Sequence, residues 1–267
     1  MIIGVPKEIK AQEHRVALLP SAAYQLIKHG HKVLVESNAG AGIGFGDDNY
    51  AQAGAEIIKS HAEVFERADM IVKVKEPQKV EWEMLREDQI LFTYLHLAPD
   101  PEQTKGLLAS KCAAVAYETV TDDRKGLPLL AAMSEVAGRI AVFSAAETLL
   151  KHNGGMGLLF CGVPGVAPAR VLVLGGGVVG LNAARMAMGL GADVTILEVD
   201  LERMRFLDMT MHGSHTLYSN QTHLMDLLPR VDLLIGAVLV PGSKAPKLIT
   251  REMLRCMRPG SVLVDIA

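Results

Sequence analysis

The sequence predicts an α/β protein of two domains, each with a mainly parallel sheet flanked by helices. Short apolar segments alternate with segments of helical periodicity along the chain, and a glycine-rich motif joins one apolar segment to a helix. The length of 267 residues suits two domains at roughly 150 residues each. We expect the first domain over residues 1–128 and the second over residues 129–267, the second having a Rossmann-type sheet.

The first half of the chain alternates strands and helices. Its apolar segments predict strands over residues 1–5, 32–35, 70–74, 90–94 and 113–117. Apolar residues at helical spacing predict helices over residues 21–29, 62–68 and 102–109, the first of which ends at Gly30. Residues 37–49 carry a second glycine cluster and are predicted to be a structural loop, because Asp47 and Asp48 would repel phosphate. Strands separated by helices pair in parallel.

The second half repeats this alternation with stronger strands. A long helix of small residues over 130–150 suits a connection between two domains, and the Gly- and Pro-rich residues 153–157 and 161–168 are predicted to be irregular. Apolar segments predict strands over residues 171–174, 194–197, 216–219, 233–238 and 262–266. Five such strands with helices between them predict a doubly wound parallel sheet.

Composition excludes several classes of protein. The net charge is 27 − 30 = −3, no basic block occurs, and only 4% of residues are aromatic, so a nucleic-acid surface is not expected. The three cysteines, Cys112, Cys161 and Cys256, are odd in number and contain no CxxC pair, which favours a reducing cytoplasm. Charged Lys7 and Glu8 come too early for a signal peptide, and no strongly apolar stretch approaches the roughly 20 residues of a membrane span. We therefore expect a cytoplasmic protein without a membrane partner.

The most informative motif is VLVLGGGVVGLNAARMAMGLGADVTILEVD. Gly175, Gly177 and Gly180 fit G-x-G-x-x-G between an apolar strand and a helix. Glycine allows the tight turn, the approach of a pyrophosphate and the packing of helix on strand, and the helix N-terminus offers free N–H groups to phosphate. Without further context the motif could be a structural turn.

An acidic residue at the expected distance strengthens the dinucleotide interpretation. Glu198 ends the second strand, 198 − 175 = 23 residues after the first glycine. A carboxylate there accepts hydrogen bonds from ribose hydroxyls and repels a 2′-phosphate, so the sequence predicts NAD in preference to NADP. Arg203 and Arg205 weaken that preference, because either side chain could reach a 2′-phosphate.

Candidate substrate residues follow strands of the first half. His96 comes just after the strand at 90–94, where ligands bind in open α/β sheets, and His is the usual proton carrier near neutral pH. Lys73 and Lys75 share one face by period-two alternation, and the sequence does not choose between them. Arg15 offers a bidentate fork for a carboxylate. The alternatives are a structural role for His96 and an ordinary solvated side chain for Arg15. No metal site is expected, because His212, His215 and His223 lack the compact spacing of zinc ligands.

Taken together, the motifs resemble a known family over essentially the whole chain. The matching segments are IGVPKEIKAQEHRVALLP, IVKVKEPQ, ILFTYLHLAPD, AYETV, LPLLAAMSEVAGR, GGVVGLNAARMAMGLGA and VDLLIGAVLVPGSKAPKLIT. With these segments the sequence closely resembles bacterial NAD-dependent alanine dehydrogenases, which are related to the alpha subunit of proton-translocating transhydrogenase. The resemblance implies that Arg15 and Lys75 bind the substrate and that His96 is the acid–base residue. For the cofactor it implies Ser134, Gly175, Gly177, Val178, Val179, Gly180, Glu198, Arg203, Asn220, Leu239, Val240, Ile266 and Ala267.

The resemblance implies reversible oxidative deamination of L-alanine to pyruvate and ammonia with NAD, by a homo-oligomer that is a hexamer in this family. It also implies that a C-terminal return segment with the family's catalytic Asp is missing after Ala267, which would leave both domains incomplete. Loss of an acid–base residue costs about 10²- to 10⁴-fold in rate. The alternatives are a non-catalytic truncated homologue that binds NAD and a nucleotide-binding domain like that of the transhydrogenase alpha subunit. The VKVKEP and LHLA segments favour the dehydrogenase.

Overall fold

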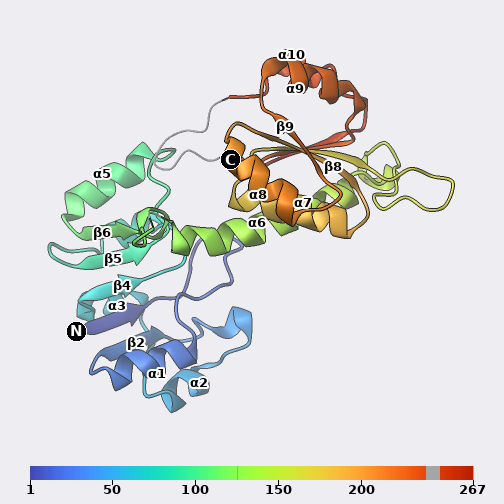
Figure 1. Cartoon of the computed structure of the whole chain (residues 1–267). Helices are drawn as coiled ribbons and strands as arrows, with labels where there is room; N and C mark the ends of the chain where they lie inside the picture. The colour runs from blue at the N-terminus through green and yellow to red at the C-terminus, as the bar shows by residue number, and fades with distance from the viewer. Residues whose placement is uncertain (125, 239–246, 267) are drawn as a thin grey trace. The chain divides into compact units, whose positions relative to one another are not determined.

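The computed structural model describes residues 1–124, 126–238 and 247–266. The chain divides into two compact units, unit 1 over Met1–Leu129 and unit 2 over Leu130–Ala267. Each unit contains one parallel sheet with helices against it (Figure 1). The predicted fold class, two α/β domains with parallel sheets, is confirmed.

Unit 1 is built on a six-stranded sheet in the order β3-β2-β1-β4-β5-β6, in which every neighbouring pair is parallel. Its strands are β1 (Ile2–Val5), β2 (Lys32–Glu36), β3 (Glu56–Ile58), β4 (Met70–Val72), β5 (Ile90–Thr93) and β6 (Ala113–Ala116). Its helices are α1 (Pro20–Lys28), α2 (Asp47–Gln52), α3 (His61–Arg67), α4 (Lys79–Trp82) and α5 (Pro101–Ser110).

Side chains of the unit 1 sheet alternate between two apolar cores. Val33 and Val35 of β2 pack with Ala23 of α1 on one face. Leu34 between them packs with Phe65 of α3 on the other face. This alternation is the period of two that the pleat of a strand imposes, and helices cover both faces as they do in parallel sheets.

Unit 2 is built on a five-stranded parallel sheet in the order β11-β10-β7-β8-β9, which confirms the doubly wound sheet. Its strands are β7 (Arg170–Leu174), β8 (Asp193–Glu198), β9 (His215–Tyr218), β10 (Leu233–Gly236) and β11 (Val262–Asp265). Its helices are α6 (Pro128–Thr148), α7 (Val178–Gly189), α8 (Leu201–Thr210), α9 (Gln221–Leu227) and α10 (Arg251–Leu254). Val171 and Val173 face the core under α6 and α7, and Leu172 faces the core under α9.

The structure corrects several predicted element bounds. Helix α2 lies partly inside the stretch predicted as loop, where Asp47 accepts hydrogen bonds from the Ser37 hydroxyl and the Asn38 N–H and so holds the loop to the helix. Strand β4 ends at Val72, two residues before the predicted end. Past Val72, backbone hydrogen bonds still join the chain to the segment of β5, from the Lys73 N–H to Phe92 and from the Tyr94 N–H to Val74.

One helix in the described part of the chain, α6, is long and apolar enough to cross a membrane by length and composition, with 21 residues and a mean hydropathy of 1.4. A core helix of a soluble protein meets the same criterion, so a single such helix is weak evidence for a membrane span. In unit 2, Val142 and Ala145 of this helix, and Leu149 just after it, are buried in the core that α7 shares.

Candidate active site

Four strands of unit 1 end along one edge of its sheet and carry the candidate substrate residues there. Strands β1, β4, β5 and β6 are consecutive neighbours and run parallel, so their carboxyl ends share an edge. Arg15 follows β1, Lys75 follows β4 and His96 follows β5. The topology therefore gathers three residues that lie up to 81 positions apart in the sequence. This edge is where open parallel sheets bind ligands.

Arg15 is held by a carboxylate two residues before it. Its Nε and Nη2 donate to the two oxygens of Glu13 at 2.8 and 2.6 Å, a bidentate pair. The hydrogen bonds with Arg15 hold the pKa of Glu13 at about 2, to which the charge of Lys75 also contributes. The same hydrogen bonds raise the pKa of Arg15, so both groups stay ionised at neutral pH.

The second glycine cluster packs against the segment that carries Arg15. A Cβ on Gly42 would lie 2.4 Å from the carbonyl oxygen of His14, closer than any real Cβ contact. Residue 42 must therefore be glycine for this loop to approach the chain beside Arg15. The structure gives the loop a supporting role and agrees with the prediction that it is structural.

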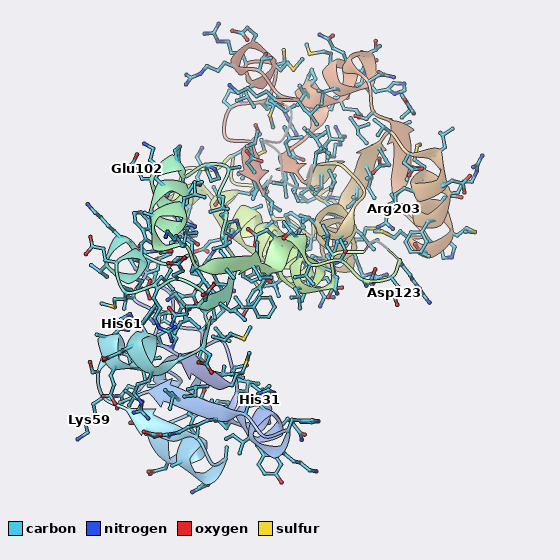
Figure 2. All side chains as sticks on the ribbon, turned by 90° about the vertical axis from the view of Figure 1, so that its left-hand side faces the viewer. His31, Lys59, His61, Glu102, Asp123 and Arg203 are labelled. Atoms are coloured by element: carbon cyan, nitrogen blue, oxygen red, sulfur yellow. The ribbon has the colours of Figure 1, made fainter. Side chains whose placement is uncertain are left out.

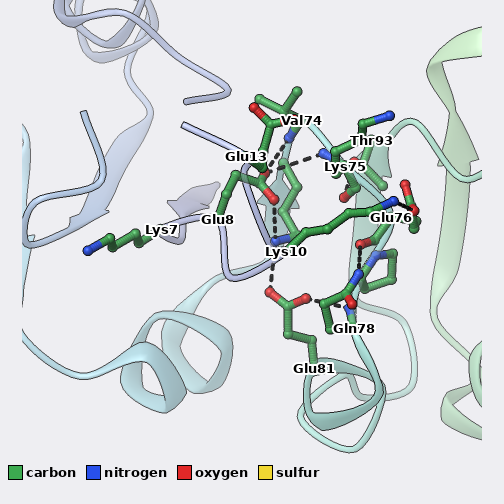
Figure 3. Close-up of polar contacts among 12 residues, drawn as sticks. Lys7, Glu8, Lys10, Glu13, Val74, Lys75, Glu76, Gln78, Glu81 and Thr93 are labelled. Carbon is green, nitrogen blue, oxygen red and sulfur yellow. Dashed lines mark hydrogen bonds and ion pairs between the residues drawn. The ribbon is translucent and has the colours of Figure 1, made fainter. Parts of the chain in front are cut away.

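The structure distinguishes the two lysines that the sequence left as alternatives. Lys73 is fully buried, and its Nζ lies 3.0 Å from Glu8 and 2.8 Å from Glu81. Lys75 is partly exposed, and no ion pair of its Nζ occurs among the described residues. Glu8 also accepts from the backbone N–H of Val74 at 2.6 Å and of Lys75 at 3.4 Å (Figure 3). Lys73 is thus a buried structural cation, and Glu8 fixes the backbone that presents Lys75.

The buried ion pair continues toward α3. Nε2 of His61, at the start of that helix (Figure 2), lies 3.3 Å from Glu81, and its Nδ1 lies 2.6 Å from Glu36. Burial lowers the pKa of His61, but its contacts with Glu36 and Glu81 outweigh burial and raise it to about 9. Burial raises the pKa of Glu81, and contacts with His61 and Lys73 reverse this to a net lowering. The cluster thus pairs Lys73 and His61 with the side chains of three glutamates, Glu8, Glu36 and Glu81.

His96 follows β5 in a strained backbone conformation with its side chain exposed. Its φ is +49°, in the left-handed region that costs an L-residue roughly 1–2 kcal/mol. The carboxylate of Glu118 accepts from the N–H of His96 at 2.7 Å and from the N–H of Leu95 at 3.1 Å. The ring of Tyr94 stacks with the His96 ring at a centroid distance of 6.1 Å.

In unit 2 the glycine motif forms the predicted turn between β7 and α7. Gly175 has φ +91°, and a Cβ on Gly180 would lie 1.8 Å from the carbonyl oxygen of Gly175. These two glycines are needed for the turn and for the approach of helix to strand. A Cβ on Gly177 would meet no protein atom within 4 Å, so packing inside the chain does not explain a glycine there. Open space beside the N-terminus of α7 fits a bound phosphate group.

Glu198 ends β8 and supports the glycine turn directly. It accepts from the N–H of Gly176 at 2.7 Å and from the N–H groups of Val199 and Asp200 at 2.7 and 3.0 Å. A carboxylate has about four acceptor positions, so three bonds leave capacity for a ribose hydroxyl. Arg203 of α8 (Figure 2) donates to the carbonyl oxygen of Gly176 at 2.6 Å, which ties it to the same turn.

The other predicted cofactor residues occupy varied positions in unit 2. Val178 and Val179 begin α7, Ser134 is buried on α6, and Ile266 packs against the core next to β11. Asn220 caps α9 by accepting from the N–H of His223 at 2.8 Å, which gives it a structural role. Leu239, Val240 and Ala267 lie outside the described residues.

Three carboxylates around the substrate residues escaped the sequence analysis: Glu8, Glu13 and Glu118. Glu118 had a detectable pattern, because it comes just after the apolar strand at 113–117, as His96 comes after 90–94. The role of Glu8 depends on a contact with the N–H of Val74, 66 positions along the chain, and the role of Glu13 depends on its hydrogen bonds with the Arg15 side chain. Neither contact follows from a motif. Among the described residues, no group of three or more His, Cys, Asp or Glu side chains is placed to hold a metal ion.

The fold and the two sites define a nucleotide-binding α/β oxidoreductase. Two family models match the chain, the N-terminal domain of alanine dehydrogenase/PNT over residues 4–137 and the C-terminal domain over residues 141–267. The chain belongs to the alanine dehydrogenase/PNT family.

Relatives and solved structures agree with this assignment. The chain is 55% identical to an alanine dehydrogenase of Halomonas elongata and 53% identical to one of Bacillus subtilis, over all of this chain and 72% and 70% of theirs. A solved L-alanine dehydrogenase has a TM-score of 0.92 at 48% identity over all of this chain and 74% of its own. A transhydrogenase from Sinorhizobium meliloti has a TM-score of 0.81 at 26% identity, over 98% of this chain and 77% of its own.

Proposed function

We propose that this protein is an NAD-dependent alanine dehydrogenase that interconverts L-alanine with pyruvate and ammonia. The observation that carries the proposal is the edge of unit 1 where Arg15, Lys75 and His96 follow neighbouring parallel strands. Identities of 53–55% to alanine dehydrogenases, against 26% to the transhydrogenase structure, favour this activity over the transhydrogenase alternative.

The residues of unit 1 bind the substrate and move a proton. Arg15 and Lys75 are cations that attract the alanine carboxylate, and Glu13 and Glu8 keep them in place. His96 accepts a proton from the water that adds to the imine after Cα is oxidised, and returns it when the direction is reversed. Residues 1–128 are thus proposed as the substrate domain.

Residues 129–267 are proposed as the NAD-binding domain. NAD, when bound, supplies the acceptor for the hydride that leaves Cα of alanine. Gly177 and the N-terminus of α7 would hold its pyrophosphate, and the spare acceptor capacity of Glu198 would hold a ribose hydroxyl. A carboxylate at this position favours NAD over NADP. From the family resemblance we also propose a cytoplasmic homo-oligomer.

One assay tests the activity. Purified protein with NAD and L-alanine should produce NADH, measured by its absorbance, and His96→Ala should lower the rate by about 10²- to 10⁴-fold. His212→Ala is a matched control, since His212 is exposed and lies outside both sites. Saturable NAD binding without NADH formation would show that the chain binds the cofactor but is not an alanine dehydrogenase.

A further inference from the structure

Four backbone contacts fix the short segment that carries His96. Leu95 is buried in the apolar core of unit 1, and its carbonyl oxygen accepts from the buried amide of Gln103 at 2.7 Å. Its N–H donates to both oxygens of Glu118, at 3.1 and 3.2 Å. The next N–H, that of His96, donates to the same carboxylate at 2.7 Å. Glu118 therefore binds two consecutive amides at the end of β5.

The position of Glu118 follows from the sheet. Strand β6 pairs with β5 in parallel, with Thr93 opposite Ala116, so residues just after β6 lie beside residues just after β5. Glu118 and His96 thus meet at the edge of the sheet although they are 22 residues apart. The N–H groups beyond the last rung of the ladder would lack a partner, and the carboxylate supplies one.

We propose that Glu118 is a positioning residue that holds His96 in its left-handed conformation and so directs the imidazole toward the substrate. This inference rests on the proposed function, in which His96 carries the proton. Strain of roughly 1–2 kcal/mol at φ +49° persists only when surrounding contacts enforce it. The bonds to Glu118 are charge-assisted and strong enough to do so.

The role of Glu118 requires acceptor oxygens, which predicts a difference between two substitutions. Glu118→Ala removes both acceptors, so the segment relaxes and the imidazole is misplaced. A misplacement of about 1 Å can lower turnover by roughly 10²-fold. Glu118→Gln keeps one acceptor oxygen, so kcat should recover to within about tenfold of the wild-type value. In both variants KM for NAD should be unchanged.

The experiment combines turnover with amide exchange in the full chain. Wild type, Glu118→Ala and Glu118→Gln are assayed for NADH formation, each with His96 present and each combined with His96→Ala. Glu102→Ala is the control, because the Glu102 side chain of α5 is exposed. Glu118→Ala should lower kcat in the wild type but not further in His96→Ala, because its effect passes through His96. Hydrogen exchange of the Leu95 and His96 amides should quicken at least about tenfold in Glu118→Ala and remain slow in Glu118→Gln.

The outcomes separate this proposal from the proposed function. If wild type forms no NADH, the dehydrogenase assignment fails, and amide exchange still decides whether Glu118 holds the segment. Unchanged exchange in Glu118→Ala overturns the positioning role. In an active protein, equal losses of kcat in Glu118→Ala and Glu118→Gln overturn it too, as does an equal loss with and without His96.

Discussion

Residues of the same type two positions apart can have unrelated roles, as Lys73 and Lys75 show. Lys73 pairs with Glu8 and Glu81 in the interior, so Lys73→Met leaves Glu8 buried without its cation and Glu81 with His61 alone. We expect this change to lower the free energy of unfolding by about 3–5 kcal/mol, the range measured when one partner of a buried ion pair is removed. Urea denaturation followed by circular dichroism measures it.

Lys75→Met is the matched comparison for Lys73→Met. Because Lys75 is partly exposed and has no ion pair among the described residues, its loss should change the unfolding free energy by less than about 1 kcal/mol. Its turnover of alanine should fall sharply, because the substrate carboxylate loses a cation. Equal effects of the two substitutions on stability would contradict the separate roles.

At the scale of an element, the close packing of helix α7 on strand β7 can be tested by substituting Gly180. Gly180→Ala would place a methyl group 1.8 Å from the carbonyl oxygen of Gly175, so the helix must move away from the strand. We expect NAD to bind at least about tenfold more weakly by titration calorimetry, because the N–H groups at the helix start move with it. The loss of stability should be about 1–3 kcal/mol, as for overpacking.

Gly189→Ala is a control on the same helix. It ends α7, and a Cβ there meets nothing within 4 Å. Alanine should be tolerated or stabilise the helix by up to about 1 kcal/mol, with NAD affinity unchanged. Equal weakening of NAD binding in both variants would mean that the glycine turn is not what places the helix for the phosphate.

The same scale shows which elements the sequence could predict. Strands such as β7 and β8 were found because their apolar residues, four in succession in β7 and three among the six of β8, leave a clear pattern. Strand β3 has three residues and α4 has four, too few to show a period, and both were missed. Helix α2 was missed because it begins with two aspartates in a glycine-rich stretch, where the hydrogen bonds of Asp47 with Ser37 and Asn38 help to hold the helix start.

For the whole molecule, the alternation of strands and helices along the sequence predicted parallel sheets. It did not predict which strands are neighbours in each sheet. The order β1-β4-β5-β6 brings Arg15, Lys75, His96 and Glu118 to one edge, and this order depends on packing between distant segments. The alternation of side chains along a strand placed Lys73 and Lys75 on the same face. In the structure only Lys73 is buried, where it contacts Glu8 and Glu81, which lie 65 and 8 positions away in the sequence. Motif spacing therefore identified candidate residues, and tertiary contacts determine what each of them does.

The buried charges of unit 1 also make the stability of the whole molecule depend on pH. The pKa of His61 is raised from 6.5 to about 9 in the folded protein. Its contribution to stability is therefore complete below about pH 6.5 and is lost as pH rises through 9. A shift of this size corresponds to roughly 3 kcal/mol. On the acid side, Glu13, with a pKa of about 2, contributes above about pH 4.5, and its contribution is lost as pH falls toward 2.

Urea unfolding of the wild type and His61→Gln between pH 6 and pH 10 tests the alkaline side. The wild type should be more stable than the variant at pH 6, and the difference should shrink by roughly 3 kcal/mol as pH passes through 9, because His61 then loses the charge that pairs with Glu36 and Glu81. Exposed His212→Gln should follow the wild type throughout. A constant difference between wild type and His61→Gln across this range would show that folding does not raise the pKa of His61.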